Sequence, residues 1–183
     1  MKTILLTSLL AAFLFNTSIY EFKINSIEEG KQINLASYKG KKILIVNTAC
    51  NSRYTFQLQG LQQLYSAYRE KLVVIAFPAG EDFGDQELKS NKEILSFFRG
   101  NYGTTFPITE KTSVQGELQH PIFGYLIAEA KKLGMDDPII KWNFTKFLLD
   151  ENGQLIWVFP ADVTPLSPEI TGLLNNKQPW SLN

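Results

Sequence analysis

The stretch that decides the fold is Lys42–Gln57, with the sequence KILIVNTACNSRYTFQ. An apolar run ends at Asn47, a short polar turn follows, and an amphipathic segment begins directly after it. This order predicts a buried strand that leads through a loop into a helix N-terminus. In α/β proteins the chemistry often lies at such a place, because the strand fixes the loop and the helix N-terminus favours anions. The turn also carries Cys50, the one cysteine of the chain.

The segments around this stretch predict an α/β chain. Apolar residues at three- and four-residue spacing indicate a helix over about 54–70, and a second continuous apolar run ends at Pro78. Two buried strands joined by a helix predict a right-handed parallel βαβ unit. The other expected elements are a hairpin over 20–35, a helix from Ser90 to about Gly103 with a Ser90–Glu93 capping box, a helix from Pro121 to Gly134, a hairpin over 144–159 turning at 151–153, and a last helix capped at Ser167-Pro168.

The order of these elements is that of a thioredoxin-like α/β domain. It implies a central mixed sheet flanked by helices, with an extra N-terminal β-hairpin. At 183 residues the chain is long enough for one domain with a sizeable core. Its 18 basic and 18 acidic residues give a net charge of zero and form no blocks, so nothing indicates nucleic acid or an anionic membrane as a partner.

The N-terminus differs in composition from the rest. Ile4–Phe15 is an almost unbroken apolar run after Met1-Lys2, which predicts a secretory signal peptide over residues 1–18 and a folded domain over 19–183. The run is shorter than the roughly 20 residues that span a bilayer. Asn16 fits a cleavage site after Ser18 poorly, which leaves an uncleaved anchor as the alternative. We therefore expect an exported protein, periplasmic or secreted, without membrane contact once the signal is removed.

Single residues with chemical potential are few. An unpaired cysteine in an exported protein is a buried hydrophobe, a reactive thiol, or half of an intermolecular disulfide. The one histidine, His120, has no second ligand at metal spacing, and no metal or other cofactor is predicted. The acidic residues that follow the second buried strand are most simply a solvated loop: Glu81, Asp82, Asp85 and Glu87.

Short motifs in a fixed order give the chain a resemblance to the glutathione peroxidase family, from about Tyr20 to Leu174. The resemblance implies a thioredoxin-like fold and an ancestry in reducing hydrogen peroxide or organic hydroperoxides with thiol electrons. The motifs are Asn47-Thr48-Ala49, Tyr54-Thr55 with Gln57, Gly60-Leu61, Phe77-Pro78-Ala79, Asp82-Phe83-Gly84 with Gln86-Glu87, Tyr102-Gly103, Thr105-Phe106-Pro107, Val114 with Gly116, His120-Pro121, and Trp142-Asn143-Phe144-Thr145-Lys146-Phe147.

The chain departs from the family at the reacting position. Family members read NVASKCG, and a gapless count from Asn47 places Ser52 at the peroxide-attacking cysteine or selenocysteine, while Cys50 falls where serine is usual. A serine hydroxyl cannot take over the attack, which needs a thiolate that becomes a sulfenic acid. Cys50 lies two residues earlier, a displacement of about 6–7 Å in extended chain. Only a rebuilt loop would bring its sulfur to the family position.

The remaining site positions are only partly retained. Trp142 and Asn143 match the family's hydrogen-bond donors, whereas Asp82, with Glu81 as a competitor, stands where many members have glutamine. No second cysteine lies near 97–101, so turnover would need an external thiol such as thioredoxin or glutathione, or an intermolecular disulfide. The short segment 131–141 predicts a monomer. Two hypotheses result: a thiol peroxidase that uses a displaced Cys50, and a catalytically inactive pseudoenzyme that serves as an exported binding or scaffold protein.

Overall fold

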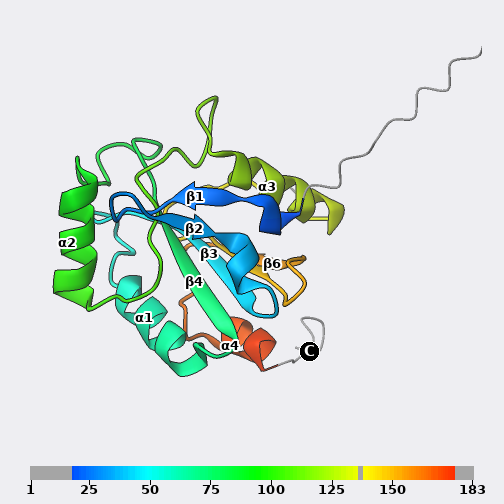
Figure 1. Cartoon of the computed structure of the whole chain (residues 1–183). Helices are drawn as coiled ribbons and strands as arrows, with labels where there is room; N and C mark the ends of the chain where they lie inside the picture. The colour runs from blue at the N-terminus through cyan, green and yellow to red at the C-terminus, as the bar shows by residue number, and fades with distance from the viewer. Residues whose placement is uncertain (1–17, 136–137, 176–183) are drawn as a thin grey trace, which may run out of the picture.

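A four-stranded mixed sheet forms the centre of the molecule (Figure 1). The structure is a computed structural model, and it describes residues 18–135 and 138–175. The strand order is β4-β3-β5-β6, with β3 at Lys42–Thr48, β4 at Leu72–Pro78, β5 at Lys146–Leu149 and β6 at Leu155–Phe159. β3 runs parallel to β4 and antiparallel to β5, and β5 and β6 form an antiparallel hairpin. The predicted mixed sheet is confirmed.

The parallel pair β3 and β4 sets the position of the candidate site. All seven residues of each strand are buried, as the continuous apolar runs predict. Helix α1, Gln57–Tyr68, connects the two strands, which confirms the βαβ unit. The register pairs Thr48 with Pro78, so the loops that follow both strands leave the same edge of the sheet.

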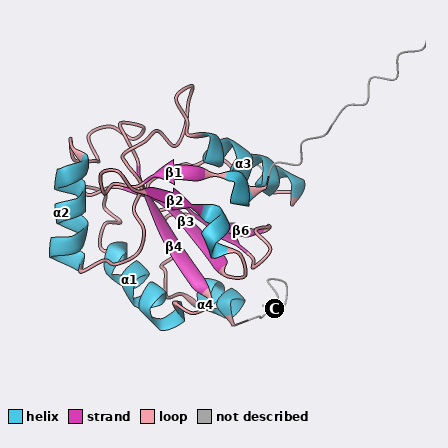
Figure 2. Cartoon of the chain, in the orientation of Figure 1, coloured by secondary structure: helices cyan, strands magenta, loops and turns pink. Residues whose placement is uncertain are grey.

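Each face of the sheet is covered by its own core. On one face, apolar side chains of α1, of α2 (Asn91–Tyr102) and of α4 (Pro168–Leu174) pack against Leu44, Val74 and Leu148. On the other face, α3 (Pro121–Lys132) packs with Ile45, Ile75 and the N-terminal segment. That segment contains two short 3-10 helices, Ile19–Glu21 and Leu35–Tyr38, and a separate antiparallel hairpin of β1 (Lys23–Asn25) and β2 (Gln32–Asn34). Figure 2 shows the strands between these helices.

Most of the predicted elements are present, with two local differences. The Ser90–Glu93 capping box of α2 and the extra N-terminal hairpin are confirmed. α1 begins at Gln57, three residues later than predicted, because residues 54–56 belong to the preceding turn. α4 is present, but the Ser167 hydroxyl is buried and makes no capping hydrogen bond. Ser167 thus occupies the predicted N-cap position, but without a side-chain hydrogen bond among the described residues.

The predicted signal peptide falls almost entirely on residues 1–17, which lie outside the described residues. Within 18–135 and 138–175, no helix is long and apolar enough to cross a membrane.

Candidate active site

The turn after β3 is held by hydrogen bonds to one threonine. The Thr55 hydroxyl donates to the carbonyl oxygen of Ser52 at 2.6 Å and also lies 2.9 Å from the Ala49 and 3.1 Å from the Cys50 carbonyl oxygen. The Tyr54 amide donates to the Ser52 hydroxyl oxygen at 3.3 Å. The turn thus places Cys50 and Ser52, both buried, directly before α1.

Cys50 is part of the hydrophobic core. Its side chain is 4% exposed and belongs to the apolar cluster that includes Leu58 and Phe98. Of the three interpretations that the sequence leaves open, the described residues place Cys50 in the first, a buried thiol. A buried thiol favours its neutral form, because the charged form loses hydration.

Glu87 is the charged group that raises the pKa of this thiol. One of its carboxylate oxygens accepts hydrogen bonds from the amides of Cys50 at 3.1 Å and Leu88 at 2.8 Å. Burial, and then the negative charge of Glu87, raise the pKa of the Cys50 thiol far above its ordinary value. Burial also raises the pKa of the Glu87 carboxyl group itself. The environment therefore suppresses the thiolate that peroxide chemistry requires.

The prediction that all four acids form a solvated loop is wrong for Glu87. The loop folds onto the turn after β3, where the Asn51 amide donates to the Gln86 carbonyl oxygen at 2.8 Å. This contact leaves Glu87 half-buried, with its Oε2 atom buried, while Glu81 and Asp85 remain exposed. Sequence reasoning had one signal for it, since Gln86-Glu87 belongs to the motifs that carry the family resemblance.

The Asp82 carboxylate is engaged elsewhere. It accepts a hydrogen bond from the Val114 amide at 3.0 Å, and the Asp82 carbonyl oxygen accepts one from the Gln115 side chain at 2.8 Å. These bonds fasten the acidic loop to the segment before α3. Neighbouring Phe83 reaches the site instead, with its ring 5.4 Å from that of Trp142.

Trp142 and Asn143 lie in a second turn, just before β5. The Trp142 carbonyl oxygen accepts hydrogen bonds from the side chains of Asn47 at 3.3 Å and Thr145 at 3.0 Å. Phe144 has a φ of 70°, a left-handed conformation that costs a non-glycine residue about 1–3 kcal/mol. Its amide donates to the Asn47 carbonyl oxygen at 2.6 Å. Asn47, at the end of β3, thus ties the second turn to the strand that precedes Cys50.

The buried polar atoms of this second turn are not satisfied within the described part of the chain. The indole nitrogen of Trp142 and both side-chain polar atoms of Asn143 have no hydrogen-bond partner there, and neither does the hydroxyl of Thr48. Cys50 and Ser52 therefore receive no hydrogen bond from the two side chains that match the family's donors. Native proteins satisfy most of their buried polar groups, so these four atoms call for an explanation.

A pocket of about 400 Å³ lies beside Trp142. Arg53 contributes to its wall, with its guanidinium carbon 4.8 Å from the ring centre of Tyr54 and 5.9 Å from that of Trp142. Apolar side chains such as Val158 and Ile139 line the rest of it. The volume falls in the range of small-molecule sites. In the described ranges, no group of three or more His, Cys, Asp or Glu residues could hold a metal ion.

The sheet, its helices and the turn after β3 define a thioredoxin-like domain. Solved structures agree: a crystal structure of T. cruzi GPX1 aligns with a TM-score of 0.66 and 29% identity, covering 87% of this chain and 97% of that one. A thiol:disulfide interchange protein of the thioredoxin family from Chlorobium tepidum, 17% identical with a TM-score of 0.56, is similar in fold.

The family follows from the sequence comparisons. The family model described as "Glutathione peroxidase" matches residues 19–127. The chain is 43% identical over 160 residues to a glutathione peroxidase homolog BsaA of Staphylococcus epidermidis, covering 86% of this chain and 99% of that protein. It is 41% identical over 149 residues to a glutathione peroxidase-like peroxiredoxin of Chlamydomonas reinhardtii, covering 80% and 90%. The chain belongs to the glutathione peroxidase family.

Proposed function

We propose that this family member has lost the direct attack of its own thiol on hydroperoxides and serves as a binding or scaffold protein. One observation carries the proposal: the only thiol of the chain is buried in the core beside the Glu87 carboxylate. The gapless count that assigns the reacting position to Ser52 supports it. The pocket beside Trp142 offers a place for a small ligand.

The chemistry explains why this observation matters. In the family reaction a thiolate sulfur attacks one peroxide oxygen, the O–O bond breaks, and a sulfenic acid forms while water or an alcohol leaves. The attack needs an ionised and accessible sulfur. Cys50 meets neither condition well, because its side chain is buried and because burial and the charge of Glu87 raise the pKa of its thiol. At Ser52 the equivalent product would itself be a peroxide, so the hydroxyl does not replace the thiol.

Peroxide oxidation of the reduced protein tests the proposal. The rate of Cys50 oxidation is followed by stopped flow and mass spectrometry with excess hydrogen peroxide and an organic hydroperoxide. Cys50→Ser serves as the control for other oxidation sites. We expect Cys50 to react no faster than a free thiol. Rapid sulfenic acid formation, absent from Cys50→Ser, would overturn the proposal.

The second candidate is the family's thiol peroxidase reaction after rearrangement of the turn. The indole N–H group of Trp142 and the side-chain NH2 group of Asn143, which have no partner among the described residues, favour it, since a sulfur brought to them would accept their hydrogen bonds. Turnover would then consume a hydroperoxide and an external thiol such as glutathione or thioredoxin. Peroxide consumption that depends on both the thiol and Cys50 would establish this candidate over the first.

We also infer that the protein acts outside the cytoplasm as a monomer. The apolar run at residues 4–15 supports export, and the short segment 131–141 supports the monomer. Fractionation of cells that express the full chain, followed by mass determination of the N-terminus, tests export and cleavage together. Retention in the cytoplasm at full length would contradict it. Light scattering of the purified protein gives the oligomeric state.

A further inference from the structure

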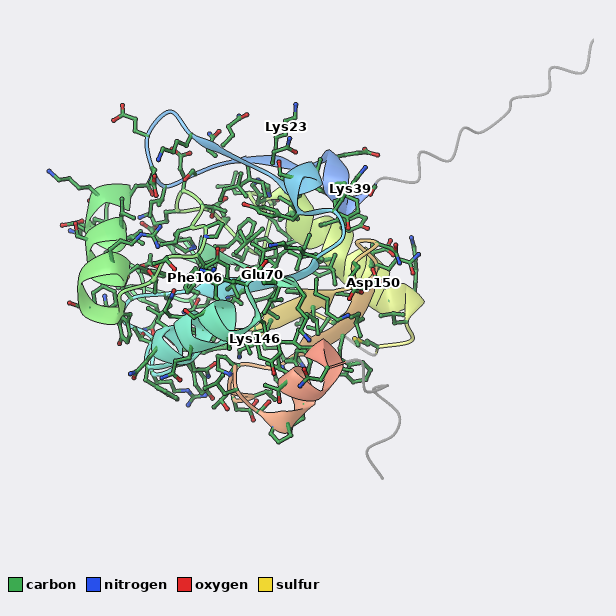
Figure 3. The ribbon with its side chains drawn as sticks, turned by 60° about the horizontal axis from the view of Figure 1, so that its bottom comes forward. Lys23, Lys39, Glu70, Phe106, Lys146 and Asp150 are labelled. Carbon is green, nitrogen blue, oxygen red and sulfur yellow. The ribbon has the colours of Figure 1, made fainter. Side chains whose placement is uncertain are left out.

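Lys146, on β5, is labelled in Figure 3. Its side chain is completely buried. Fully buried lysines are rare unless they are paired, and within the described residues Lys146 forms no ion pair. Its Nζ donates to the carbonyl oxygen of Phe144 at 2.7 Å and to that of Ala161 at 3.5 Å. A buried amine whose hydrogen bonds both go to backbone carbonyl groups indicates that the side chain holds those carbonyl groups in place.

The first of these carbonyl groups belongs to the strained residue of the candidate site. Phe144 has a φ of 70°, and its amide is already bonded to the Asn47 carbonyl oxygen. Lys146 holds the other polar group of the same residue. We propose that Lys146 is a positioning residue: by holding the Phe144 carbonyl group, it keeps the turn at 142–144 in the conformation that presents Trp142 and Asn143.

The second carbonyl group links this turn to the rest of the site. The Ala161 oxygen also accepts a hydrogen bond of 2.6 Å from the side chain of Gln57, the first residue of α1. One buried network therefore joins three segments: the turn at 142–144, the loop after β6, and the helix start that follows Ser52. We therefore expect a change at Lys146 to affect all three segments.

The number of donors makes this network sensitive to protonation. A neutral amine has two N–H groups, which match the two carbonyl groups, whereas an ammonium group has a third N–H group to satisfy. The buried Oε1 of Gln57 has no hydrogen-bond partner in the described part of the chain and is the acceptor that belongs to the same network. Protonation therefore favours a shift of Lys146 toward Gln57.

The pH at which this shift occurs follows from the surroundings. Burial lowers the pKa of Lys146 to about 7, and the negative charge of Asp162 partly opposes this effect. Asp162, in the loop after β6, is the charged group that acts on this pKa. Near neutral pH, both protonation states of Lys146 are thus populated, and we expect the turn to respond to the change between them.

NMR of the Trp142 indole N–H group tests the proposal without any assumption about Cys50. Its ¹H–¹⁵N cross-peak, assigned with Trp142→Phe, is recorded from about pH 5.5 to pH 9. In the parent protein the peak should move with a midpoint of about 7. The variant Lys146→Met has a side chain of similar length but no hydrogen-bond donor. In this variant the peak should be displaced at every pH and should no longer titrate. An identical peak and profile in both proteins would overturn the proposal.

Two control variants separate this role from general stability. Lys42→Met removes another buried lysine, which is paired with Glu151 at the far end of β3, and should lower stability without moving the Trp142 peak. His120→Asn removes an imidazole and should leave the midpoint unchanged. If either control variant displaced the Trp142 peak and removed its titration as Lys146→Met does, the proposal would be overturned. If Lys146→Met does not fold, the parent decides, because a peak that stays fixed over the whole range contradicts the inference.

Discussion

At the scale of single residues, Cys50 and Glu87 act as a pair. The Glu87 carboxylate accepts a hydrogen bond from the backbone amide of Cys50, and its negative charge opposes ionisation of the Cys50 thiol. Burial acts in the same direction and is the larger cause. A thiol in such surroundings behaves as a small apolar side chain. The pair therefore opposes formation of the thiolate that the family's chemistry requires.

Glu87→Gln should make Cys50 more reactive, because it removes the negative charge and retains a side chain of the same shape. We expect the pH profile of Cys50 alkylation to shift toward lower pH, while burial still keeps the rate below that of a free thiol. The measurement is the alkylation rate by mass spectrometry as a function of pH. Asp85→Asn, an exposed acid in the same loop, serves as control. Equal profiles for parent and Glu87→Gln would show that Glu87 has no influence on the thiol.

Ser52→Cys should create a peroxide-reactive thiol if Ser52 occupies the family's reacting position. In a Cys50→Ser background, we expect oxidation by hydrogen peroxide to exceed that of parent Cys50 by roughly 10²-fold, the scale of preorganised hydrogen-bond donors. Stopped-flow kinetics with the Cys50→Ser single variant as the baseline give the comparison. A thiol at position 52 that reacts no faster than Cys50 would contradict the assignment of Ser52.

The sequence predicts only part of the site at this scale. Counting from Asn47 places Cys50 and Ser52 in one turn, and the structure has them there. Apart from the Gln86-Glu87 motif, nothing in the sequence indicates that Glu87 is removed from solvent, because its position results from the acidic loop folding onto a turn more than thirty residues away. The engagement of Asp82 by the Val114 amide likewise depends on a long-range contact that residue type alone does not reveal.

At the scale of helices and strands, local signals predict most of the fold. The continuous apolar runs of β3 and β4 and the capping box of α2 specify these elements without tertiary information. The start of α1 differs from its prediction because the Thr55 hydroxyl donates to the Ser52 carbonyl oxygen and lies close to those of Ala49 and Cys50, which holds residues 52–55 in a turn. Apolar spacing does not detect such a competing turn.

The buried lysine of β5 should make stability depend on pH. The pKa of Lys146 is lowered to about 7 in the folded protein, whereas in the unfolded chain it is about 10.4. Between these values the unfolded chain binds more protons, so the free energy of unfolding rises with pH. We expect a rise of roughly 2–4 kcal/mol from pH 7 to pH 10 in the parent relative to Lys146→Met. Urea unfolding of both proteins as a function of pH measures this rise. The same pH dependence in the parent and in Lys146→Met would contradict a lowered pKa of Lys146 in the folded protein.

At the scale of the whole molecule, two cores on opposite faces of one sheet hold the domain together. The chain retains the family's fold over nearly its whole described length, although its single thiol lies in one of these cores. Activity depends on a few atoms at the end of β3, whereas the fold depends on both cores. Membership of the family is thus compatible with a site that has lost its thiolate.

The N-terminal segment should depend on one glycine for its packing. Gly153, in the β5–β6 turn, has a φ of 78°, and a Cβ atom there would lie 2.5 Å from Ile19 and 2.8 Å from Tyr20. Gly84 has a similar φ of 74° but open space around it. We expect Gly84→Ala to cost about 1–2 kcal/mol of stability for its backbone conformation, and Gly153→Ala to cost about 1–3 kcal/mol more for the clash. Thermal unfolding of both variants measures this, and equal losses would mean that the segment does not pack on the turn.

The ionisation of Cys50 tests the central claim most directly. Thiolate formation in the reduced, folded protein is followed by ultraviolet absorbance as the pH is raised, with Cys50→Ser subtracted. The account predicts no thiolate at pH values where an ordinary thiol, with a pKa of about 8.5, is already ionised. A midpoint at or below that value, in protein that circular dichroism shows to be folded, would contradict the account and return Cys50 to the position of a working peroxidase thiol.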